Sequence, residues 1–338
     1  MAEMGETESI GNSGRDPTQG GEAAYFPLRF IVDFLRFLRD NRARVNVITY
    51  DDLAWGDDYD LERNYAQERQ RWLERRARGE IDPDKVHVLL QHDVDTRPER
   101  TMALLRHEEA LGIPSNVMIF WRRISRRTLR DRGELEYTPY ELDAEFLRDL
   151  QTKRFVVGYH SNAFEQALFD IDRAQDIFVK DLQALSQQFD INYFSAHGGA
   201  PGPEGRNNRD VPLPAAFRDS VRWVHNGHSP WFTATYSDGG INSLKRDPAK
   251  RDLRDFVRTW RRGERYRVLL HPQYYHDPCS ISPRLAGTPW YEEVRAFYAS
   301  GRRGSLWDNI DIREWSARGF SGRVARISGA LKRCLGVP

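Results

Sequence analysis

From residue 86 onward the chain alternates between short β-rich runs and longer segments of helical periodicity. Repeated strand-then-helix units build a parallel sheet, because each helix carries the chain back to the start of the next strand. Such a sheet is either open and doubly wound or closed into a (β/α) barrel, and about seven units favour a barrel, which could be irregular. The β-rich runs are VHVLLQH from 86, SNVMIFW from 115, FVVGYH from 155, INYFSAH from 191, VRWVHN from 221, WFTATY from 231 and YRVLLH from 266.

The pattern divides the chain into four parts. We expect a disordered tail over 1–23, a helical N-terminal extension packed on the barrel over 24–85, the barrel itself over 86–304, and a helical tail over 305–338. Within the extension, the apolar residues of YFPLRFIVDFLRFLRD recur at helical spacing and predict a docking helix. Three Thr residues, each followed by Pro within two positions, predict helix N-caps at Thr96, Thr138 and Thr288.

Composition excludes some classes of partner. The 51 Lys and Arg residues nearly balance 50 acids, and a net charge of +1 gives no case for a nucleic-acid partner. Cys279 and Cys334 form neither a disulfide framework nor a metal cluster. The first residues are acidic where a signal peptide is basic, and no apolar run is long enough to span a bilayer. We therefore expect a cytoplasmic protein, and the oligomeric state stays open.

Polar residues follow several of the β-rich runs. The carboxyl ends of parallel strands open onto one face of the sheet, where active sites gather, so these residues are expected to converge. A carboxylate and neutral imidazoles are ordinary ligands for zinc or a similar divalent ion, and a second carboxylate and a histidine can move protons around it. The set favours metal-assisted hydrolysis of an amide or ester. Its members are Asp93, Asp95, His160, His197 and His271.

Four segments, in this order and at these intervals, resemble the successive motifs of the polysaccharide deacetylase superfamily, also called the NodB-homology family. They are HDVDTRPER, VVGYHSNAFEQ, SAHGGAPG and LLHPQYY, and the resemblance covers about residues 86–300, with the HDVD form typical of a divergent branch. It implies a distorted barrel of about seven strands and removal of N-linked acyl groups from sugars. By the same resemblance Asp93 is the base, Asp95 and His160 are ligands of a divalent metal, with zinc the expected ion, and His271 is the acid.

Two positions depart from the family pattern. The second motif of many members has another histidine four residues after the first, where this chain has Phe164. His197 is favoured as the third ligand because a strand end is rigidly placed, with Glu165 as the alternative. The third motif usually carries an arginine that pairs with the base. SAHGGAPG has no arginine, although Arg206 and Arg209 follow in the same loop.

Further residues are candidates for sugar contacts or for structural roles. Tyr159, Asp238 and Tyr274 are assigned to substrate binding, while Asp238 could equally orient a catalytic histidine or form a turn; Trp121 and Trp231 are aromatic candidates. Alternation along a strand turns His92 away from Asp93. The TYDD sequence at 49–52 is interpreted as a helix N-cap or turn, with Asp51 and Asp52 outside the site. His225 and His228 are assigned to a loop.

Three functions follow from these residues. The first is a hydrolase that removes an N-acyl group, acetyl or formyl, from a sugar or sugar conjugate. The second is hydrolysis of another C–N bond, as in a cyclic amide or ureide. The third is a non-catalytic carbohydrate-binding protein with a degenerate metal site, which Phe164 permits.

Overall fold

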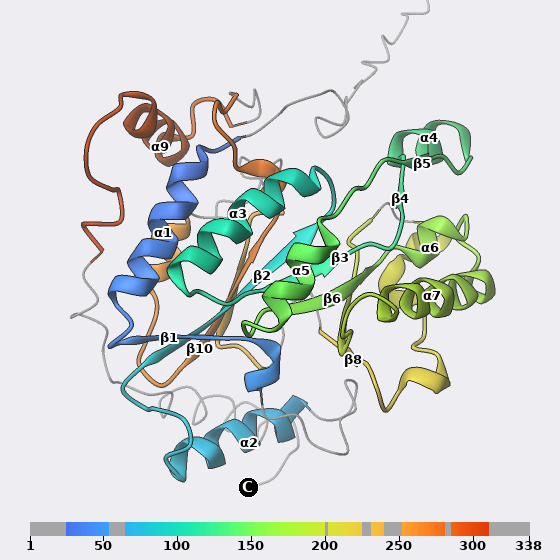
Figure 1. The fold of residues 1–338 in the computed structure, drawn as a ribbon, viewed down its shortest axis with the longest axis horizontal. Helices are drawn as coiled ribbons and strands as arrows, with labels where there is room; N and C mark the ends of the chain where they lie inside the picture. The colour runs from blue at the N-terminus through green and yellow to red at the C-terminus, as the bar shows by residue number, and fades with distance from the viewer. Residues whose placement is uncertain are drawn as a thin grey trace, which may run out of the picture.

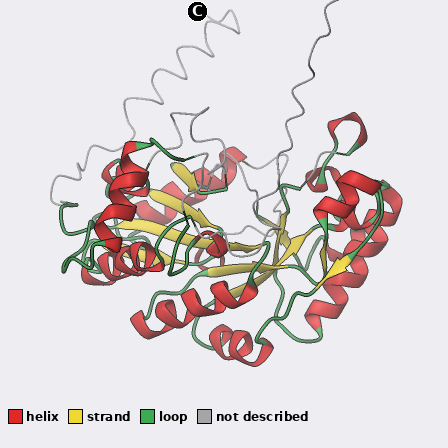
Figure 2. Cartoon of the chain, turned by 90° about the horizontal axis from the view of Figure 1, so that it is seen from above, coloured by secondary structure: helices red, strands yellow, loops and turns green. Residues whose placement is uncertain are grey.

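The computed structural model describes residues 25–53, 65–199, 202–224, 231–239, 252–280 and 285–310, with the side chains of 65–69 left out (Figure 1). At its centre lies one sheet in which every strand pairing is parallel. Seven strands follow one another in the order β8-β7-β6-β3-β2-β10-β9, and β1 pairs with the first half of β2. The sheet curls into a half-barrel with helices around it (Figure 2), which confirms the expected fold.

The seven strands correspond to the seven β-rich runs of the sequence. β2 is the longest because its first half pairs with β1 and its second half with β3 on the same edge. The strands of the sheet are β1 (Val45–Ile48), β2 (Val86–Val94), β3 (Asn116–Ile119), β6 (Val156–Ser161), β7 (Tyr193–Ala196), β8 (Arg222–Trp223), β9 (Ala234–Ser237) and β10 (Arg265–Leu270).

Helices cover the outer face of the sheet, and α1, α3 and α5 lie in front of it in Figure 1. Their apolar sides form two large clusters with the strands, and a third cluster, which includes Leu89 and Tyr193, fills the inside of the curve. The helices are α1 (Leu28–Asp40), α2 (Tyr65–Ala77), α3 (Pro98–Leu111), α4 (Arg126–Arg132), α5 (Ala144–Gln151), α6 (Ala163–Gln166), α7 (Ile171–Ser186), α8 (Leu253–Arg258) and α9 (Pro289–Ala299).

Of the three predicted N-caps, only Thr288 is correct, at the start of α9. Thr96 is wrong because α3 is preceded by Arg97, whose φ of 53° makes the sharp turn after β2. Thr138 is wrong because it belongs to β5 (Tyr137–Thr138), which pairs antiparallel with β4 (Arg123–Ile124). The helix that follows begins instead after Asp143, whose carboxylate accepts from the backbone N–H of Phe146. Pairing between distant segments overrode the local signal there.

The N-terminal segment before β2 contains a strand of the sheet and contacts the turn after β10. Besides α1 and α2 it contributes β1, which the expectation of a helical extension did not include. The backbone N–H groups of Tyr25 and Phe26 both donate to the carbonyl oxygen of Tyr274, at 2.8 and 2.9 Å. Tyr274 ends the short 3-10 turn η6 (Pro272–Tyr274) that follows β10. The extension therefore holds a turn at the carboxyl end of the sheet.

Residues 1–24 and 311–338 lie outside the described residues. The predicted disordered tail and most of the predicted C-terminal helical tail fall on these residues. Just before that point, Trp307 is buried and its indole N–H donates to the carbonyl oxygen of Phe30 in α1. Within the described part of the chain, no helix is both long and apolar enough to cross a membrane.

Candidate active site

The polar strand-end residues meet at the carboxyl edge of the sheet. Asp93 is the last residue but one of β2, and Asp95 follows that strand directly. His160 lies near the end of β6, and His197 comes directly after β7. His271 follows β10, the neighbour of β2 on the other side. The parallel topology thus brings together residues that lie as far apart in the sequence as Asp93 and His271.

Asp95, His160 and His197 form a set of possible metal ligands, since one ligand atom from each lies within 4.8 Å of the others. Oδ1 of Asp95 is 3.2 Å from Nε2 of His160 and 3.8 Å from Nε2 of His197. That oxygen is buried, and among the described residues no group other than these two imidazoles lies within reach to donate to it. A buried carboxylate is costly unless a positive charge lies beside it, either a protonated imidazole or a bound cation. The donor set of one carboxylate and two imidazoles fits a divalent ion of the zinc type.

Second partners orient both imidazoles toward Asp95. Nδ1 of His160 lies 2.7 Å from Oγ of Ser195, and Nδ1 of His197 lies 2.7 Å from Oε2 of Glu165. Each ring is therefore held through one nitrogen, with Nε2 turned to the shared position, as is usual for histidine ligands. Glu165, the alternative third ligand, sits behind His197 as its hydrogen-bond partner.

Two phenylalanines lie next to the possible ligand set. Phe164 stands where many family members have the second histidine of the second motif, and Phe120 packs on His160 and His197. Phe164 is buried and packs edge to face against Phe169, with 5.5 Å between ring centroids. On the other side, Phe120 stacks on His160 at 5.0 Å and meets His197 at 5.1 Å and 80°. His197, from the next strand, is the third member of the possible ligand set.

Burial and charge act in opposite directions on the ligands. Burial opposes ionisation of Asp95, but the neighbouring imidazoles, His197 foremost, hold its pKa well below the usual range for a carboxyl. Burial also works to lower the pKa of His160, yet the carboxylates of Asp93 and Asp95 raise it above the ordinary histidine value. A proton and a metal ion therefore compete for the same strongly negative position.

Asp93 lies beside the ligand set without belonging to it. Its Oδ2 is 3.8 Å from Nε2 of His160, and its Oδ1 accepts a hydrogen bond of 2.7 Å from the side-chain amide of Gln91. Gln91 and Asp93 lie two residues apart on β2, on the same face of the strand. The carboxylate is thus held by one oxygen while the other faces His160.

His271 stands on the opposite side of Asp95, with Nε2 3.7 Å from Oδ2 of that residue. Asp238, directly after β9, holds it through Nδ1 at 2.5 Å and through its backbone N–H at 2.9 Å. Burial, the largest single effect, works to lower the pKa of His271, but the carboxylates of Asp238, Asp95 and Asp93 together raise it to about 10. His271 is therefore a protonated, oriented donor at neutral pH. Of the roles considered for Asp238, the structure supports orientation of this histidine.

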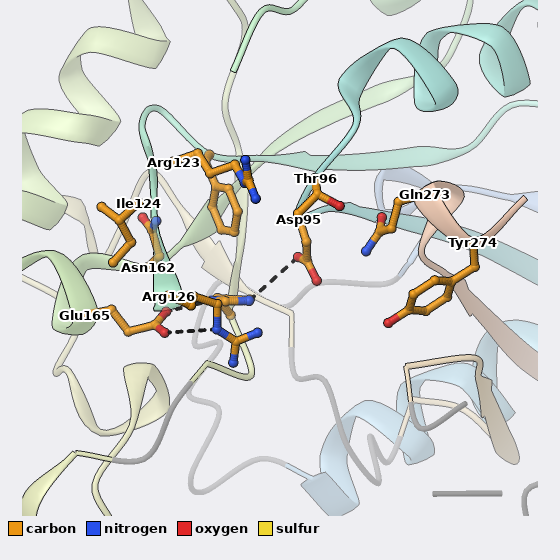
Figure 3. A pocket seen from close by; sticks show the side chains of 11 residues that line it. Asp95, Thr96, Arg123, Ile124, Arg126, Asn162, Glu165, Gln273 and Tyr274 are labelled. Atoms are coloured by element: carbon orange, nitrogen blue, oxygen red, sulfur yellow. Dashed lines mark hydrogen bonds and ion pairs between the residues drawn. The ribbon is translucent and has the colours of Figure 1, made fainter. Parts of the chain in front are cut away.

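A pocket opens over these residues (Figure 3). Arg123 of β4 and Arg126 at the start of α4 line this pocket. Arg126 also pairs with Glu165 at 3.5 Å. Tyr274, which the sequence assigned to substrate binding, lines the pocket together with Gln273 and Asn162. A second groove shares Thr96 and Arg123 with the first and continues along residues with hydroxyl and charged side chains, among them Ser125 and Thr138.

Several predicted site residues lie elsewhere. The assignment of Tyr159 to substrate binding is wrong, because its side chain is fully buried on the helical side and its hydroxyl donates to Asp181 of α7. Arg206 is exposed and pairs with Glu204. Trp231 is buried in the cluster inside the curve. His225 and His228 lie outside the described residues.

Two structural assignments hold. Asp51 and Asp52 belong to the 3-10 turn η1 (Tyr50–Asp52), where Asp52 and Thr49 form a capping box. His92 points to the other side of β2, where its Nε2 lies 2.7 Å from Glu108 of α3.

Comparison with known proteins gave matches among solved structures alone, since no family model and no curated protein matches the chain. Similar structures include a family 4 carbohydrate esterase from Bacillus anthracis, with a TM-score of 0.29, 12% identity, and coverage of 76% of this chain and 94% of that one. A family 4 acetyl xylan esterase from Clostridium thermocellum, in complex with a cobalt ion, has a TM-score of 0.27 and 14% identity over 65% of this chain and 85% of that one.

A third similar structure is a mutant of a family 4 pseudoenzyme with restored enzymatic activity. It has a TM-score of 0.29 and 15% identity, over 68% of this chain and 69% of that one. All three likenesses are distant.

Proposed function

We propose that the protein is a cytoplasmic, metal-dependent hydrolase that removes an N-acyl group, acetyl or formyl, from a sugar or sugar conjugate. The observation that carries the proposal is the buried Oδ1 of Asp95 between two oriented imidazoles, with Asp93 and His271 bordering this set. The complete ligand set favours an enzyme over a carbohydrate-binding protein with a degenerate site. Zinc is the ion that this donor set fits best.

Asp95, His160 and His197 would hold a divalent ion, which when bound would supply Lewis acidity for the acyl carbonyl and lower the pKa of a water beside it. Asp93 accepts the proton of the attacking water through Oδ2, the oxygen that faces His160. The water oxygen adds to the acyl carbon, and the C–N bond of the resulting tetrahedral centre then breaks. This assignment gives Asp93 the role of general base.

His271 donates a proton to the departing nitrogen. Its pKa of about 10 keeps the ring protonated at neutral pH, and Asp238 fixes the ring so that Nε2 faces Asp95. The products are a carboxylic acid and a free amine on the sugar, and the proton taken by Asp93 balances the proton given by His271. Asp93 lies 3.8 Å from Nε2 of His160, and His271 lies 3.7 Å from Oδ2 of Asp95, so a base and an acid both border the ligand set.

The pocket walls support a sugar as the acyl carrier. Tyr274 offers an aromatic face, and Asn162, Gln273 and Arg123 offer polar groups around the ligand set. The adjoining groove is lined by hydroxyl and charged residues, including Thr96, Ser125 and Glu141, which suit the hydroxyls of further sugar units. Aromatic faces and convergent polar groups are the usual composition of a site for a polar ligand.

The test measures acid release by full-length protein loaded with zinc or cobalt, using N-acetylated and N-formylated amino sugars and their short oligomers as probes. We expect turnover of at least one acyl sugar, and a loss of about 10²-fold or more in Asp93→Asn. His107→Ala is the control, because His107 is exposed on α3 away from the site. Turnover confined to small cyclic amides would replace the sugar by the second candidate substrate, and unchanged turnover in Asp93→Asn would remove the base assignment.

A further inference from the structure

A line of buried hydrogen bonds reaches Asp93 from the side away from the pocket. The hydroxyl of Tyr50 donates to Oε1 of Gln91 at 2.5 Å, and Nε2 of Gln91 donates to Oδ1 of Asp93 at 2.7 Å. Tyr50 and Gln91 are fully buried, and Asp93 is 3% exposed. Behind them lies Arg267 on β10, a fully buried residue whose positive charge acts to lower the pKa of Tyr50.

The chemistry of these groups allows only one direction along the line. A carboxylate oxygen accepts from the amide nitrogen of Gln91, and the amide oxygen of Gln91 can only accept, so the phenol must donate to it. The Gln91 amide is then fixed at both ends, with oxygen toward Tyr50 and nitrogen toward Asp93. Burial raises the pKa of Tyr50 to about 12 although Arg267 opposes this, so the phenol keeps the proton it donates at neutral pH.

The line is anchored in rigid parts of the fold. The backbone N–H of Tyr50 donates to Oδ1 of Asn116 at 2.9 Å, and the side-chain amide of Asn116 donates to the carbonyl oxygen of Leu90 at 2.7 Å. Arg267 lies on β10 opposite Leu89 of β2, two residues before Gln91. Hydrogen bonds of one sense in a low-dielectric interior polarise and strengthen one another.

We propose that Tyr50 and Gln91 are positioning residues that hold the carboxylate of Asp93 by Oδ1, so that Oδ2 faces the ligand set in the geometry needed for base catalysis. The inference rests on the proposed function, in which Asp93 is the base. Tyr50 belongs to the 49–52 turn, where Thr49 and Asp52 form a capping box. The proposed role therefore gives this turn a function in positioning the base. The alternative is a polar network that stabilises the core and has no effect on Asp93.

Two variants remove single links. Tyr50→Phe deletes one hydroxyl, and Gln91→Met keeps the side-chain length while removing both of its hydrogen bonds. Tyr159→Phe is the matched control, because it also deletes a buried phenol hydroxyl, one that donates to Asp181 outside the site. All are assayed below their unfolding temperatures and at equal metal content.

We expect kcat to fall about 10- to 100-fold in Tyr50→Phe and Gln91→Met with KM little changed, since small misplacements of a catalytic group have effects of this size. Tyr159→Phe should keep its kcat. Adding Tyr50→Phe to Asp93→Asn should lower kcat no further, because the line then has no base to position.

The outcomes separate the two proposals. If Asp93→Asn is inactive while Tyr50→Phe matches Tyr159→Phe, the positioning role is overturned and the proposed function stands. The positioning role is also overturned if Tyr50→Phe lowers kcat by the same factor in the Asp93→Asn background as in the wild type. If Asp93→Asn keeps its activity, the base assignment is wrong and the positioning role falls with it.

A crystallographic comparison needs no substrate. We expect one Asp93 conformer in the wild type, with Oδ1 on Gln91, and a rotated or doubled carboxylate in Tyr50→Phe. The same single conformer in both proteins would overturn the positioning role.

Discussion

Glu165 and His197 form a buried pair in which Oε2 of the carboxylate lies 2.7 Å from Nδ1 of the imidazole. Glu165 also accepts from the side-chain amide of Asn208 at 3.2 Å, and that amide donates to the backbone oxygen of His197 as well. The pair therefore fixes both the ring and the backbone of one proposed metal ligand. It also places an acid from α6 where sequence reasoning had considered a direct ligand.

Removal of this support should weaken metal binding without removing a ligand. We expect Glu165→Ala to lower the affinity for zinc about 10- to 100-fold, the usual effect of losing the partner of a ligating histidine. Glu165→Gln should lose less, since its amide oxygen can still accept from Nδ1. Competition against a chelator of known affinity measures both. Equal affinity in Glu165→Ala and the wild type would contradict this role.

The glycine pair after His197 gives a second prediction with its own control. A Cβ at Gly199 would lie 2.3 Å from the carboxylate of Glu165, whereas a Cβ at Gly198 would have nothing within 4 Å. Gly199→Ala should therefore displace Glu165 and weaken zinc binding about tenfold or more, while Gly198→Ala should bind zinc as the wild type does. Similar losses in both variants would show that the loop, and not the Glu165 contact, is responsible.

Asp238 should set the alkaline limit of activity. It is the main carboxylate that raises the pKa of His271 to about 10, so the acid stays protonated up to about that pH. In Asp238→Asn the pKa of His271 falls, and the decline of kcat with rising pH should begin at a lower pH, with a kcat loss of about tenfold or more at neutral pH. Tyr275→Phe is the control, because it removes a hydroxyl that donates to Asp238 at 2.9 Å and leaves the charge in place. An unchanged alkaline limb in Asp238→Asn would contradict the assignment of His271 as acid.

Asp181 should make stability depend on pH. Burial raises its pKa from 3.8 to about 6, although hydrogen bonds from Gln166 and Tyr159 act in the opposite direction. Between these two values the folded state holds a proton that the unfolded state has lost, so stability falls as the pH rises from about 4 to about 6. The difference corresponds to about 3 kcal/mol at most.

Asp181→Asn carries no such titration. Chemical unfolding of the metal-free wild type and of Asp181→Asn at pH 4 and pH 7 measures the effect. The free energy of unfolding of the wild type should fall relative to the variant as the pH rises. A constant difference between the two proteins would show that Asp181 titrates at the same pH in both states.

The sheet and most of the site could be predicted because they rest on local patterns and one rule of topology. β-rich runs between helical segments predict parallel strands, and parallel strands place residues such as Asp95 and His197 at one edge. Alternation along β2 placed His92 correctly, and the same rule applied to β6 would have turned Tyr159 away from His160. The error at Tyr159 was therefore avoidable.

Other parts depend on contacts between distant segments. Arg126 reaches the pocket because β4 and β5, which flank α4 in the sequence, pair with each other. No local sequence pattern indicates that pairing. Tyr50 reaches Gln91 because β1 pairs with β2, across 41 residues of chain. Gln91 itself carried a local signal, since it lies two residues before Asp93 on the same strand face. Phe120 carried none beyond its place after β3.

The central claim is an ion bound by Asp95, His160 and His197, and anomalous diffraction from crystals of the zinc-loaded, full-length protein tests it most directly. We predict one zinc ion per site, about 2.0–2.2 Å from an Asp95 carboxylate oxygen and from Nε2 of both histidines, and its loss in His160→Ala. The stoichiometry measured in solution should fall from one to zero in the same variant. Crystals with no anomalous peak between these residues, or a His160→Ala variant that keeps its zinc, would contradict the account.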